Sequence, residues 1–396
     1  MGFYVPLENL ESLKAYKYQG EDRSVVSYYV LKPFWRKFAL VFPTWMAPNV
    51  VTLLGFGFII FNVLTALYYD PSLNEESPRW TYYSYALGLF LYQLFDACDG
   101  MHARRTGQSG PLGELFDHCI DSLNTTLSLF PFCSTVGIGY NHMMVITQLA
   151  CLCNFYLSTW EEYHTHKLFL SEFSGPVEGI LLVSIGYILT GIYGPQKIWH
   201  TELTTVNFHG FHFRVESLDI MLVFSGVSLM FNILSARQNV MDYYGEHSNA
   251  QQITEKKEGC HNPKCEAMKG LLPFFAYYIS VFSLVMIEPN FISFPFVLST
   301  GFAMAFVVGR IIIAHLTKQS FPMVNAPMLV PSAQLFLYVL IVNVLGYEKS
   351  TVTNALLWTG CGLTLGIHAT FINDIIYDFT SYLDIYALSI KHKKVA

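Results

Sequence analysis

The chain has 396 residues, of which 53% are hydrophobic and only 13% are charged. A soluble domain carries about 25% charged residues, so this balance indicates a chain that is surrounded mostly by lipid. The formal net charge of −6 and the lack of a basic stripe argue against nucleic acid as a partner.

The N-terminal part, residues 1–50, contains basic and acidic residues throughout and has no long apolar stretch. We therefore expect no cleavable signal peptide in it. Residues 34–42 mix apolar and basic side chains at helical spacing, which fits a helix lying in the membrane interface and fits an ordinary helix before the first span equally well. We expect residues 1–50 to form a cytosolic segment with an interfacial helix.

Ten apolar stretches follow, each near the roughly 20 residues that a helix needs to cross a bilayer. They cover residues 51–69, 82–98, 120–139, 144–160, 178–194, 218–235, 271–287, 291–310, 328–346 and 354–373. The predicted fold class is an all-α polytopic membrane protein with about ten transmembrane helices. The polar segment 241–270 predicts a mobile cytosolic loop, followed by C-terminal transmembrane helices and a cytosolic tail over 271–396.

The basic residues predict the orientation of these spans. If both termini are cytosolic, 19 Lys and Arg residues fall in cytosolic segments and four fall on the other side, which accounts for all 23. Cytosolic loops normally carry this excess. We therefore expect the ends of the chain, and the turn between the second and third spans, to face the cytosol.

Four acidic residues surround that turn. Asp96 and Asp99 lie at the end of the second predicted span, and Asp117 and Asp121 lie at the start of the third. Spacings of three and four residues place each pair on one helix face. The Gly, Ser and Pro residues between the pairs suit a short turn, so an antiparallel helix pair brings the four carboxylates together.

Such a cluster needs a compensating charge. A charged Asp costs about 2.5–3.5 kcal/mol at membrane depth, and the four groups repel one another. Solvation at helix ends would account for one or two of them, and a proton relay would also use carboxylates. Two divalent cations would cancel four negative charges, and carboxylate oxygens suit Mg²⁺ or Mn²⁺ in phosphoryl transfer.

The same stretch carries a resemblance to a known family. Its pattern is Asp96-x2-Asp99-Gly100-x2-Ala103-Arg104-x8-Gly113-x3-Asp117-x3-Asp121. This pattern resembles the signature of the CDP-alcohol phosphotransferase family at every fixed position, and Pro48, Asn49 and Thr52 resemble that family's first-span element. The remaining chain is similar to the eukaryotic choline and ethanolamine phosphotransferases, nearest to the fungal choline enzymes. The resemblance implies a transmembrane catalytic core over residues 51–240, in the first six spans.

The resemblance also implies an activity. The expected enzyme transfers phosphocholine from CDP-choline to the hydroxyl of 1,2-diacylglycerol, giving phosphatidylcholine and CMP in the last step of the CDP-choline pathway. Transfer from CDP-ethanolamine, or from both donors, is the nearest alternative, and a cation-coupled membrane transporter is the alternative from another class. The last four spans would shape the lipid pocket or a dimer interface, and a homodimer is the expected assembly.

The implied ligands and location follow from the same likeness. Two Mg²⁺ ions, or Mn²⁺ in their place, would be held by the four Asp residues, with Asp96 and Asp117 bridging. Lys393 and Lys394 resemble a dilysine retrieval signal on a cytosolic tail. Together with the family's usual residence, this signal implies the endoplasmic reticulum membrane, with the Golgi as the alternative.

Three further residues are candidates for substrate binding. Arg104 offers a fork of donors for a pyrophosphate, whereas Arg105 suits a general cytosolic charge better. The resemblance assigns Asn49 and Gly100 to substrate binding; without it Asn49 would be a helix cap. Gly100 would admit a close backbone approach or pack against a helix.

The acceptor hydroxyl must lose a proton, and two residues are candidate bases. A metal-bound Asp121 would have a depressed pKa, whereas neighbouring carboxylates raise the pKa of His118. His118 is therefore the preferred base, and the alternative is a histidine that only orients a carboxylate. Glu114, one turn earlier, would hold His118 or substrate, or merely cap its helix.

Recognition of the alcohol is less well defined by the sequence. Tyr156, Trp160 and Tyr163 lie at a predicted cytosolic span end. A quaternary ammonium favours aromatic faces, which makes these three residues a candidate choline site. Interfacial aromatic residues also form ordinary membrane belts, and that alternative stays open.

Overall fold

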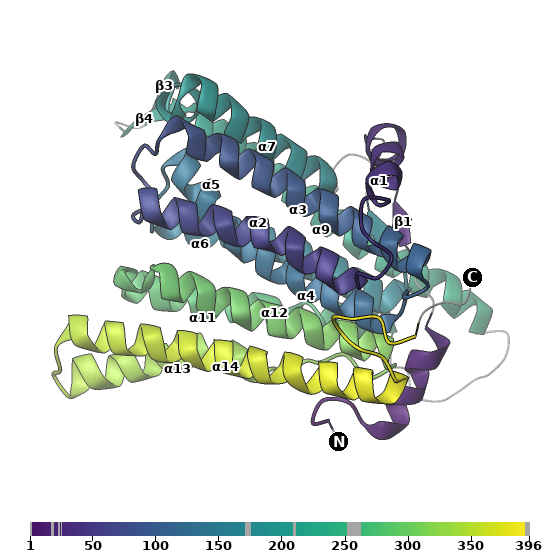
Figure 1. Ribbon diagram of the computed structural model, residues 1–396. Helices are drawn as coiled ribbons and strands as arrows, with labels where there is room; N and C mark the ends of the chain where they lie inside the picture. Colours follow the sequence, from purple (N-terminus) through teal and green to yellow (C-terminus); the bar gives the residue numbers. More distant parts are fainter. Residues whose placement is uncertain are drawn as a thin grey trace.

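The structure is a computed structural model that describes residues 2–16, 20–22, 24, 26–170, 176–208, 211–251 and 263–392. Long helices run side by side in one bundle (Figure 1). The helices of the bundle are α2 (Pro48–Tyr69), α3 (Arg79–Thr106), α4 (Pro111–Leu127), α5 (Leu129–Val136), α6 (His142–Thr165), α7 (Pro176–Tyr193), α9 (Ser217–Gln251), α11 (Leu272–Ile287), α12 (Phe294–Leu316), α13 (Val330–Tyr338) and α14 (Lys349–Leu383).

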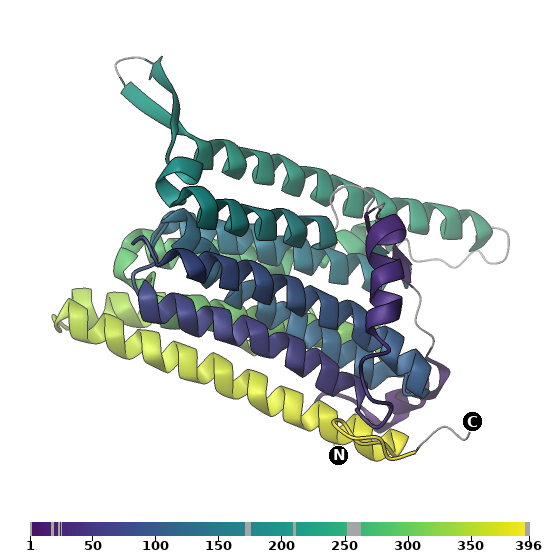
Figure 2. The same cartoon turned by 45° about the horizontal axis from the view of Figure 1, so that its top comes forward.

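Shorter elements connect them or extend their ends. They are η1 (Leu7–Ala15), η2 (Ser27–Leu31), α1 (Lys32–Phe38), α8 (Pro195–Trp199), α10 (Pro263–Lys269), η3 (Pro289–Phe291), η4 (Ala326–Leu329) and η5 (Val339–Val344). The strands β1 (Gly20–Asp22) and β2 (Leu168–Leu170) pair in parallel, and β3 (Glu202–Phe208) and β4 (Phe211–Glu216) form an antiparallel hairpin. The hairpin and α1 lie at opposite ends of the bundle (Figures 1 and 2).

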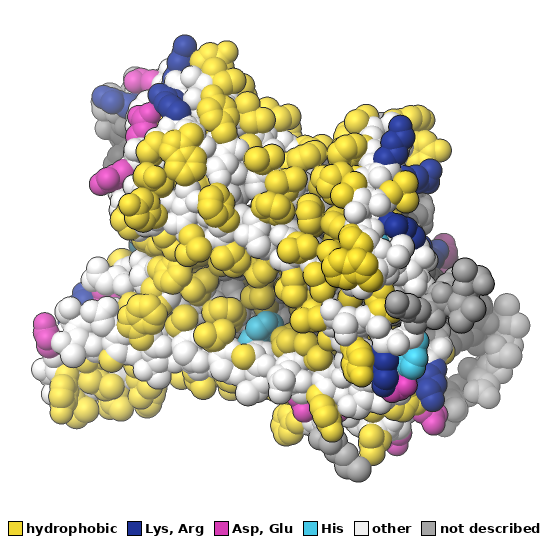
Figure 3. Space-filling model, viewed as in Figure 1, with side chains coloured by type: hydrophobic (Ala, Val, Ile, Leu, Met, Phe, Trp, Pro, Cys, Tyr) yellow, Lys and Arg dark blue, Asp and Glu magenta, His cyan; other side chains and the backbone are white. Residues whose placement is uncertain are grey.

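The predicted fold class is confirmed. Seven helical segments in the described residues are long and apolar enough to cross a membrane, and Val177–Tyr193 is a shorter apolar helix. Each of the ten predicted spans coincides with a helical segment, with α3 and the α4–α5 pair carrying the acidic residues of the predicted site. Hydrophobic side chains cover much of the surface in Figure 3, while charged ones gather near the two ends of the bundle, as expected of a surface in lipid.

Two predicted segments differ from the structure. The span predicted at 120–139 is divided between α4 and α5, which meet at Ser128. Pro131 accounts for the break, because it has no backbone N–H to continue the helical ladder. The loop expected at 241–270 is largely helical where it is described, since α9 continues to Gln251 and α10 covers Pro263–Lys269. Tyr244 anchors the extension through its hydroxyl, which lies 3.0 Å from Nδ1 of His164.

Helix α12 is the centre of the bundle, with 83% of its span buried, and it packs against α4, α6 and α14. A Cβ at Gly301 would lie 2.5 Å from Cγ2 of Thr126, so α12 and α4 approach too closely for a larger residue. The C-terminal helices therefore support α4 directly. Helix α9, by contrast, is an edge helix with 6% of its span buried, and it packs on α6.

The N-terminal segment 2–16 docks on the same end of the bundle as the turn between α3 and α4. The backbone N–H of Phe3 donates to Oδ2 of Asp374 at 2.9 Å, and Nδ2 of Asn9 donates to the carbonyl of Thr317 at 2.9 Å. Helix α1 runs across the direction of the bundle helices (Figure 1). This crossing direction fits the interfacial helix expected in residues 1–50, which stays a prediction.

Candidate active site

The turn between α3 and α4 determines where the acidic residues meet. Gly107 ends α3 with a φ of 69°, a left-handed conformation that favours glycine. Pro111 then occupies the first turn of α4, where its missing N–H costs nothing. The chain thus reverses within a few residues, and the acidic ends of the two helices lie at the same end of the bundle.

Three of the four predicted metal ligands converge. One carboxylate oxygen from each of Asp96, Asp117 and Asp121 lies within 4.8 Å of the others. Oδ1 of Asp96 and Oδ1 of Asp117 are buried and have no hydrogen-bond partner among the described residues. A buried acceptor without a partner is costly. An oxygen donor set of this kind, with two orphaned atoms, fits a divalent cation such as Mg²⁺.

Asp99 lines the same cavity but does not belong to this three-membered group. Its Oδ2 accepts a hydrogen bond from the hydroxyl of Thr52 on α2. Asp121 accepts a hydrogen bond from the hydroxyl of Tyr92, one helical turn before Asp96 on α3. Both hydroxyls orient a carboxylate. Sequence analysis missed Tyr92, although its spacing of four residues from Asp96 was the signal that could have found it.

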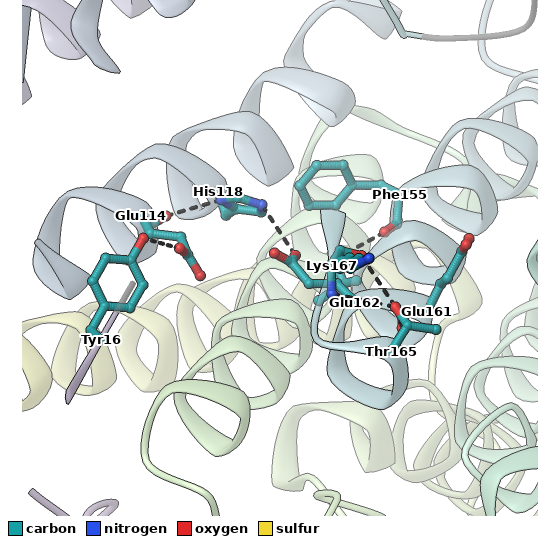
Figure 4. Close-up of polar contacts among 9 residues, drawn as sticks. Tyr16, Glu114, His118, Phe155, Glu161, Glu162, Thr165 and Lys167 are labelled. Atoms are coloured by element: carbon teal, nitrogen blue, oxygen red, sulfur yellow. Dashed lines mark hydrogen bonds and ion pairs between the residues drawn. The ribbon is translucent and has the colours of Figure 1, made fainter. Parts of the chain in front are cut away.

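His118 is buried between two acidic residues (Figure 4). Its Nδ1 lies 3.0 Å from the main-chain carbonyl oxygen of Glu114, and its Nε2 lies 3.6 Å from Oε2 of Glu162. A carbonyl oxygen only accepts hydrogen bonds, so Nδ1 carries the proton and Nε2 is the basic atom of the neutral ring. Glu114 does hold His118, but through its backbone, because its carboxylate accepts the hydroxyl of Tyr16.

Glu162 is a second residue whose role sequence analysis missed. It is 6% exposed and lies near the end of α6, 41 residues after Asp121. Its carboxylate also lies within 4.8 Å of ligand atoms from Glu114 and His315. A Glu pair, Glu161 and Glu162, inside an otherwise apolar helix was the available signal. Glu161 is used differently, since its Oε1 accepts from Nδ2 of Asn239 on α9 at 2.6 Å.

A cavity of about 2060 Å³ joins these groups. Its polar end contains the four Asp residues, His118, Asn49 and Arg104. Its apolar flank lies between α6, α7 and α9 and includes Ile146, Leu149, Phe155, Ile180, Leu182, Val183, Leu222, Val223, Phe224 and Leu229. The cavity therefore offers a charged site and an apolar chamber in one continuous space.

The two neighbouring arginines differ in their contacts. Arg105 donates from Nη1 to the carbonyls of Ala39 and Phe42, at 2.8 and 3.1 Å. Arg104 lines the cavity, and its guanidinium makes no hydrogen bond within the described part of the chain. Arg105 thus ties α3 to the segment after α1, whereas the Arg104 guanidinium is available to a ligand.

The other predicted binding residues also lie at the cavity. Asn49 is 9% exposed, and its Nδ2 donates to the carbonyl of Ala387 at 2.9 Å. A Cβ at Gly100 would meet only Nη1 of Arg104, at 3.6 Å, and a Cβ at Gly113 would meet nothing within 4 Å. Neither glycine packs against a neighbouring helix in the described structure, so their bare backbones face the cavity.

The three aromatic residues of the candidate choline site do not line the cavity. Trp160 is fully buried, and its Nε1 donates to the carbonyl of Ala267 at 3.0 Å. The hydroxyls of Tyr156 and Tyr163 donate to the carbonyls of Gly270 and Gln319, at 2.5 and 2.8 Å. The three residues fasten α6 to neighbouring segments, because an aromatic ring with one polar atom suits such a buried contact.

Comparison with known proteins gives this geometry a context. Residues 45–206 match the family profile described as CDP-alcohol phosphatidyltransferase. The chain is 62% identical over 394 residues to cholinephosphotransferase 1 of Saccharomyces cerevisiae, covering 100% of both chains. It is 58% identical over 396 residues to choline/ethanolaminephosphotransferase 1 of the same yeast, again over 100% of both. It is 31% identical over 415 residues to choline/ethanolaminephosphotransferase 1 of Arabidopsis thaliana, over 99% of both.

Proposed function

Because the chain belongs to the CDP-alcohol phosphatidyltransferase family, a family of transferases, we propose that it transfers phosphocholine from CDP-choline to the hydroxyl of diacylglycerol. The products are phosphatidylcholine and CMP. The observation that carries the proposal is the convergence of Asp96, Asp117 and Asp121 beside the buried His118, with an orphaned oxygen on Asp96 and another on Asp117. The choline donor is favoured over ethanolamine by the 62% identity to a cholinephosphotransferase, against 58% to a dual enzyme.

The acidic cluster would hold the metal. Family membership and the cluster both point to divalent cations, and we propose two Mg²⁺ ions, replaceable by Mn²⁺, with Asp96, Asp99, Asp117 and Asp121 as ligands. Bound there, the ions would neutralise charge on the phosphates and on the attacking and leaving oxygens. Thr52 and Tyr92 would keep two of the carboxylates in position through the hydrogen bonds that they donate.

His118 is the proposed base. Its Nε2 is basic because the Glu114 carbonyl binds the proton on Nδ1, and Nε2 would take the proton of the diacylglycerol hydroxyl. The carboxylate of Glu162, 3.6 Å from Nε2, would stabilise the imidazolium that results. Asp121 is the weaker candidate, since it belongs to the acidic cluster and already accepts from Tyr92.

The rest of the cavity suits the two substrates. Arg104 would bind the pyrophosphate with its free guanidinium, and Asn49 and Gly100 would contact the nucleotide end. The apolar chamber between α6, α7 and α9 would receive the acyl chains. Because α9 is an edge helix, lipid would reach the chamber sideways from the membrane.

A cation-coupled transporter fits the molecule less well. The buried carboxylate oxygens without a partner in the described residues belong to Asp96, Asp117, Glu178 and Asp378. All four lie toward the end of the bundle that carries the acidic cluster, where α7 begins and α14 ends. At the other end, Asp70 and Glu288 are saturated with hydrogen bonds from the protein. A transport pathway would need polar groups through the full depth of the membrane.

The location and the assembly are proposed from the charge distribution and from the likeness to the family. The excess of basic residues supports a cytosolic active site and cytosolic termini. Residence in the endoplasmic reticulum rests on the likeness to the family and on Lys393 and Lys394, which lie outside the described residues. A homodimer stays a prediction, which the mass of the detergent-solubilised protein by light scattering would test.

The decisive experiment supplies each nucleotide separately. Purified protein in nanodiscs is given diacylglycerol, Mg²⁺ and either CDP-choline or CDP-ethanolamine, and CMP and lipid product are measured. We expect phosphatidylcholine from CDP-choline, complete loss with a chelator and recovery on adding Mg²⁺. Equal turnover of both donors would indicate the dual enzyme, and no CMP from either donor would refute the transferase.

A further inference from the structure

The segment 384–392, directly after α14, folds back over the end of the bundle that contains the acidic cluster. It contributes one side of the cavity, through Ile385, Tyr386, Ala387, Ser389 and His392. The last helix of the chain thus delivers a piece of backbone to a site that is otherwise built from α2, α3, α4 and α6.

This segment contacts the site at two points. Nδ2 of Asn49, at the start of α2, donates to the carbonyl of Ala387 at 2.9 Å. Nε2 of Gln108, in the turn between α3 and α4, donates to the carbonyl of His392 at 2.9 Å. Both donors are side-chain amides that line the cavity, and both acceptors are main-chain atoms.

In each of these side-chain amides, the nitrogen donates to the segment and the oxygen is left for a ligand. Within the described part of the chain, the side-chain oxygens of Asn49 and Gln108 accept no hydrogen bond. An amide whose N–H group is held by a carbonyl has a defined orientation, because its oxygen must then point the other way. The two oxygens are acceptors suited to the N–H and O–H groups of a cytosine base and its ribose.

One acidic residue joins the two ends of the segment. Asp384 accepts from Nζ of Lys391 through Oδ1, and its Oδ2 lies 3.0 Å from Nε2 of His392. Lys391 also lies over the ring of Tyr386, 5.1 Å from its centroid. Hydrogen bonds from Lys391 and His392 lower the pKa of Asp384, so its carboxylate stays ionised at neutral pH.

We propose that residues 384–392 form a wall of the nucleotide subsite and orient Asn49 and Gln108 so that their side-chain oxygens face the nucleotide. Asp384 is the positioning residue that holds this wall in place. The inference rests on the proposed function, because a nucleotide donor is what the subsite binds. The segment borders the cavity and does not fill it, because its residues line the cavity together with the Asp residues.

The first test is kinetic and uses full-length protein. Replacing residues 385–392 with alternating Gly and Ser should raise KM for CDP-choline about tenfold, as two oriented hydrogen bonds are lost, with kcat and KM for diacylglycerol nearly unchanged. Asp384→Asn should raise the same KM about threefold, because an exposed ion pair contributes little. Asp384 has a φ of 55°, which Asn tolerates, so this variant removes the charge without straining the backbone. Asp242→Asn, a change at an exposed carboxylate on α9, is the matched control and should leave KM unchanged.

The second test does not depend on turnover. Ser389 is exposed at the cavity, so Ser389→Cys can be labelled with a maleimide and followed at that position by mass spectrometry. Saturating CDP-choline with Mg²⁺ should slow the labelling at least fivefold, and diacylglycerol alone should not. The proposal would be refuted by equal labelling rates with and without CDP-choline. A KM for CDP-choline that is unchanged or lower in the Gly/Ser variant would refute it as well. Failure of the unaltered protein to consume CDP-choline would instead overturn the proposed function.

Discussion

Acidic residues with buried oxygens differ in their hydrogen bonding between the two ends of this bundle. At the end with β3 and β4, Asp70 is fully buried and its Oδ1 accepts from the backbone N–H groups of Asn74 and Glu75, at 3.1 and 3.2 Å. Its Oδ2 accepts from the hydroxyl of Ser134 at 2.7 Å. Glu288 is similarly saturated, by Tyr338 and Lys349, each at 2.6 Å. At the opposite end, Asp96 and Asp117 keep an orphaned oxygen each.

The difference separates a structural acid from a ligand-binding one. An acid whose oxygens are all satisfied by the protein has no capacity left for an ion, and removing it leaves donors without acceptors. An acid with an orphaned oxygen next to other acids destabilises the protein until a cation binds. Substitutions in the acidic cluster should therefore affect mainly activity, whereas substitutions of the saturated acids should affect mainly stability.

The largest effect on activity is expected at Asp117. Asp117→Asn should reduce kcat at least about 1000-fold, because metal stabilisation of transition-state charge is worth several kcal/mol and 1.36 kcal/mol is tenfold. Without metal, the melting temperature should stay the same or rise, since a repulsive charge is removed. Transfer assays and thermal unfolding with and without Mg²⁺ measure both. More than a tenth of the original activity would contradict the ligand role.

The second effect concerns the base. His118→Gln should lower kcat about 100-fold or more, the usual contribution of general base catalysis, and Glu162→Gln should lower it about tenfold. The control is the Mg²⁺ concentration that gives half-maximal activity, which should not change in either variant. If high Mg²⁺ restored the activity of His118→Gln, the histidine would only be orienting a metal ligand.

The third effect distinguishes the two arginines. Arg104→Ala should lower kcat/KM for CDP-choline about 10- to 100-fold, because a hydrogen bond to a charged group is worth about 1.5–3 kcal/mol. Arg105→Ala is the matched variant on the same helix, and it should lower stability with less than about a threefold effect on kcat/KM. Equal kinetic losses would show that a general positive charge is what matters.

The smallest effect on activity is expected at the saturated end. Asp70→Ala should lower the free energy of unfolding by about 1–3 kcal/mol, because it leaves buried donors unsatisfied. Activity per folded molecule should not change. Thermal unfolding and the specific activity of the folded, detergent-solubilised protein test this. A loss of kcat without a loss of stability would contradict the structural role of Asp70.

Much of the fold was predictable because hydrophobic length is a local property. Each apolar stretch had to become a helix, since unpaired backbone groups are costly in lipid. The break between α4 and α5 and the extension of α9 were missed for different reasons. The first depends on one proline inside an apolar run, and the second on contacts made by Tyr244 with a distant helix.

The site was predictable where it depends on spacing along one helix pair. The pattern of the Asp residues predicted their convergence, and Asp96, Asp117 and Asp121 do converge. Glu162 could not be found in this way, because its approach to His118 depends on how α6 packs against α4. The candidate choline site at Tyr156 and Trp160 fails for a related reason, since only tertiary structure shows that both rings are buried and do not line the cavity.

The docking of the N-terminal segment has a consequence for biosynthesis. The hydrogen bond from Phe3 to Asp374 joins residues that are 371 positions apart, and Lys14 lies 4.9 Å from the ring centroid of Tyr382. During translation, this segment cannot make these contacts until α14 has left the ribosome and entered the bilayer. Tyr16, whose hydroxyl donates to the carboxylate of Glu114, is the last residue of the same segment. A chain whose translation stops before α14 therefore lacks these contacts. The surroundings of His118 are complete only after α14 has been inserted.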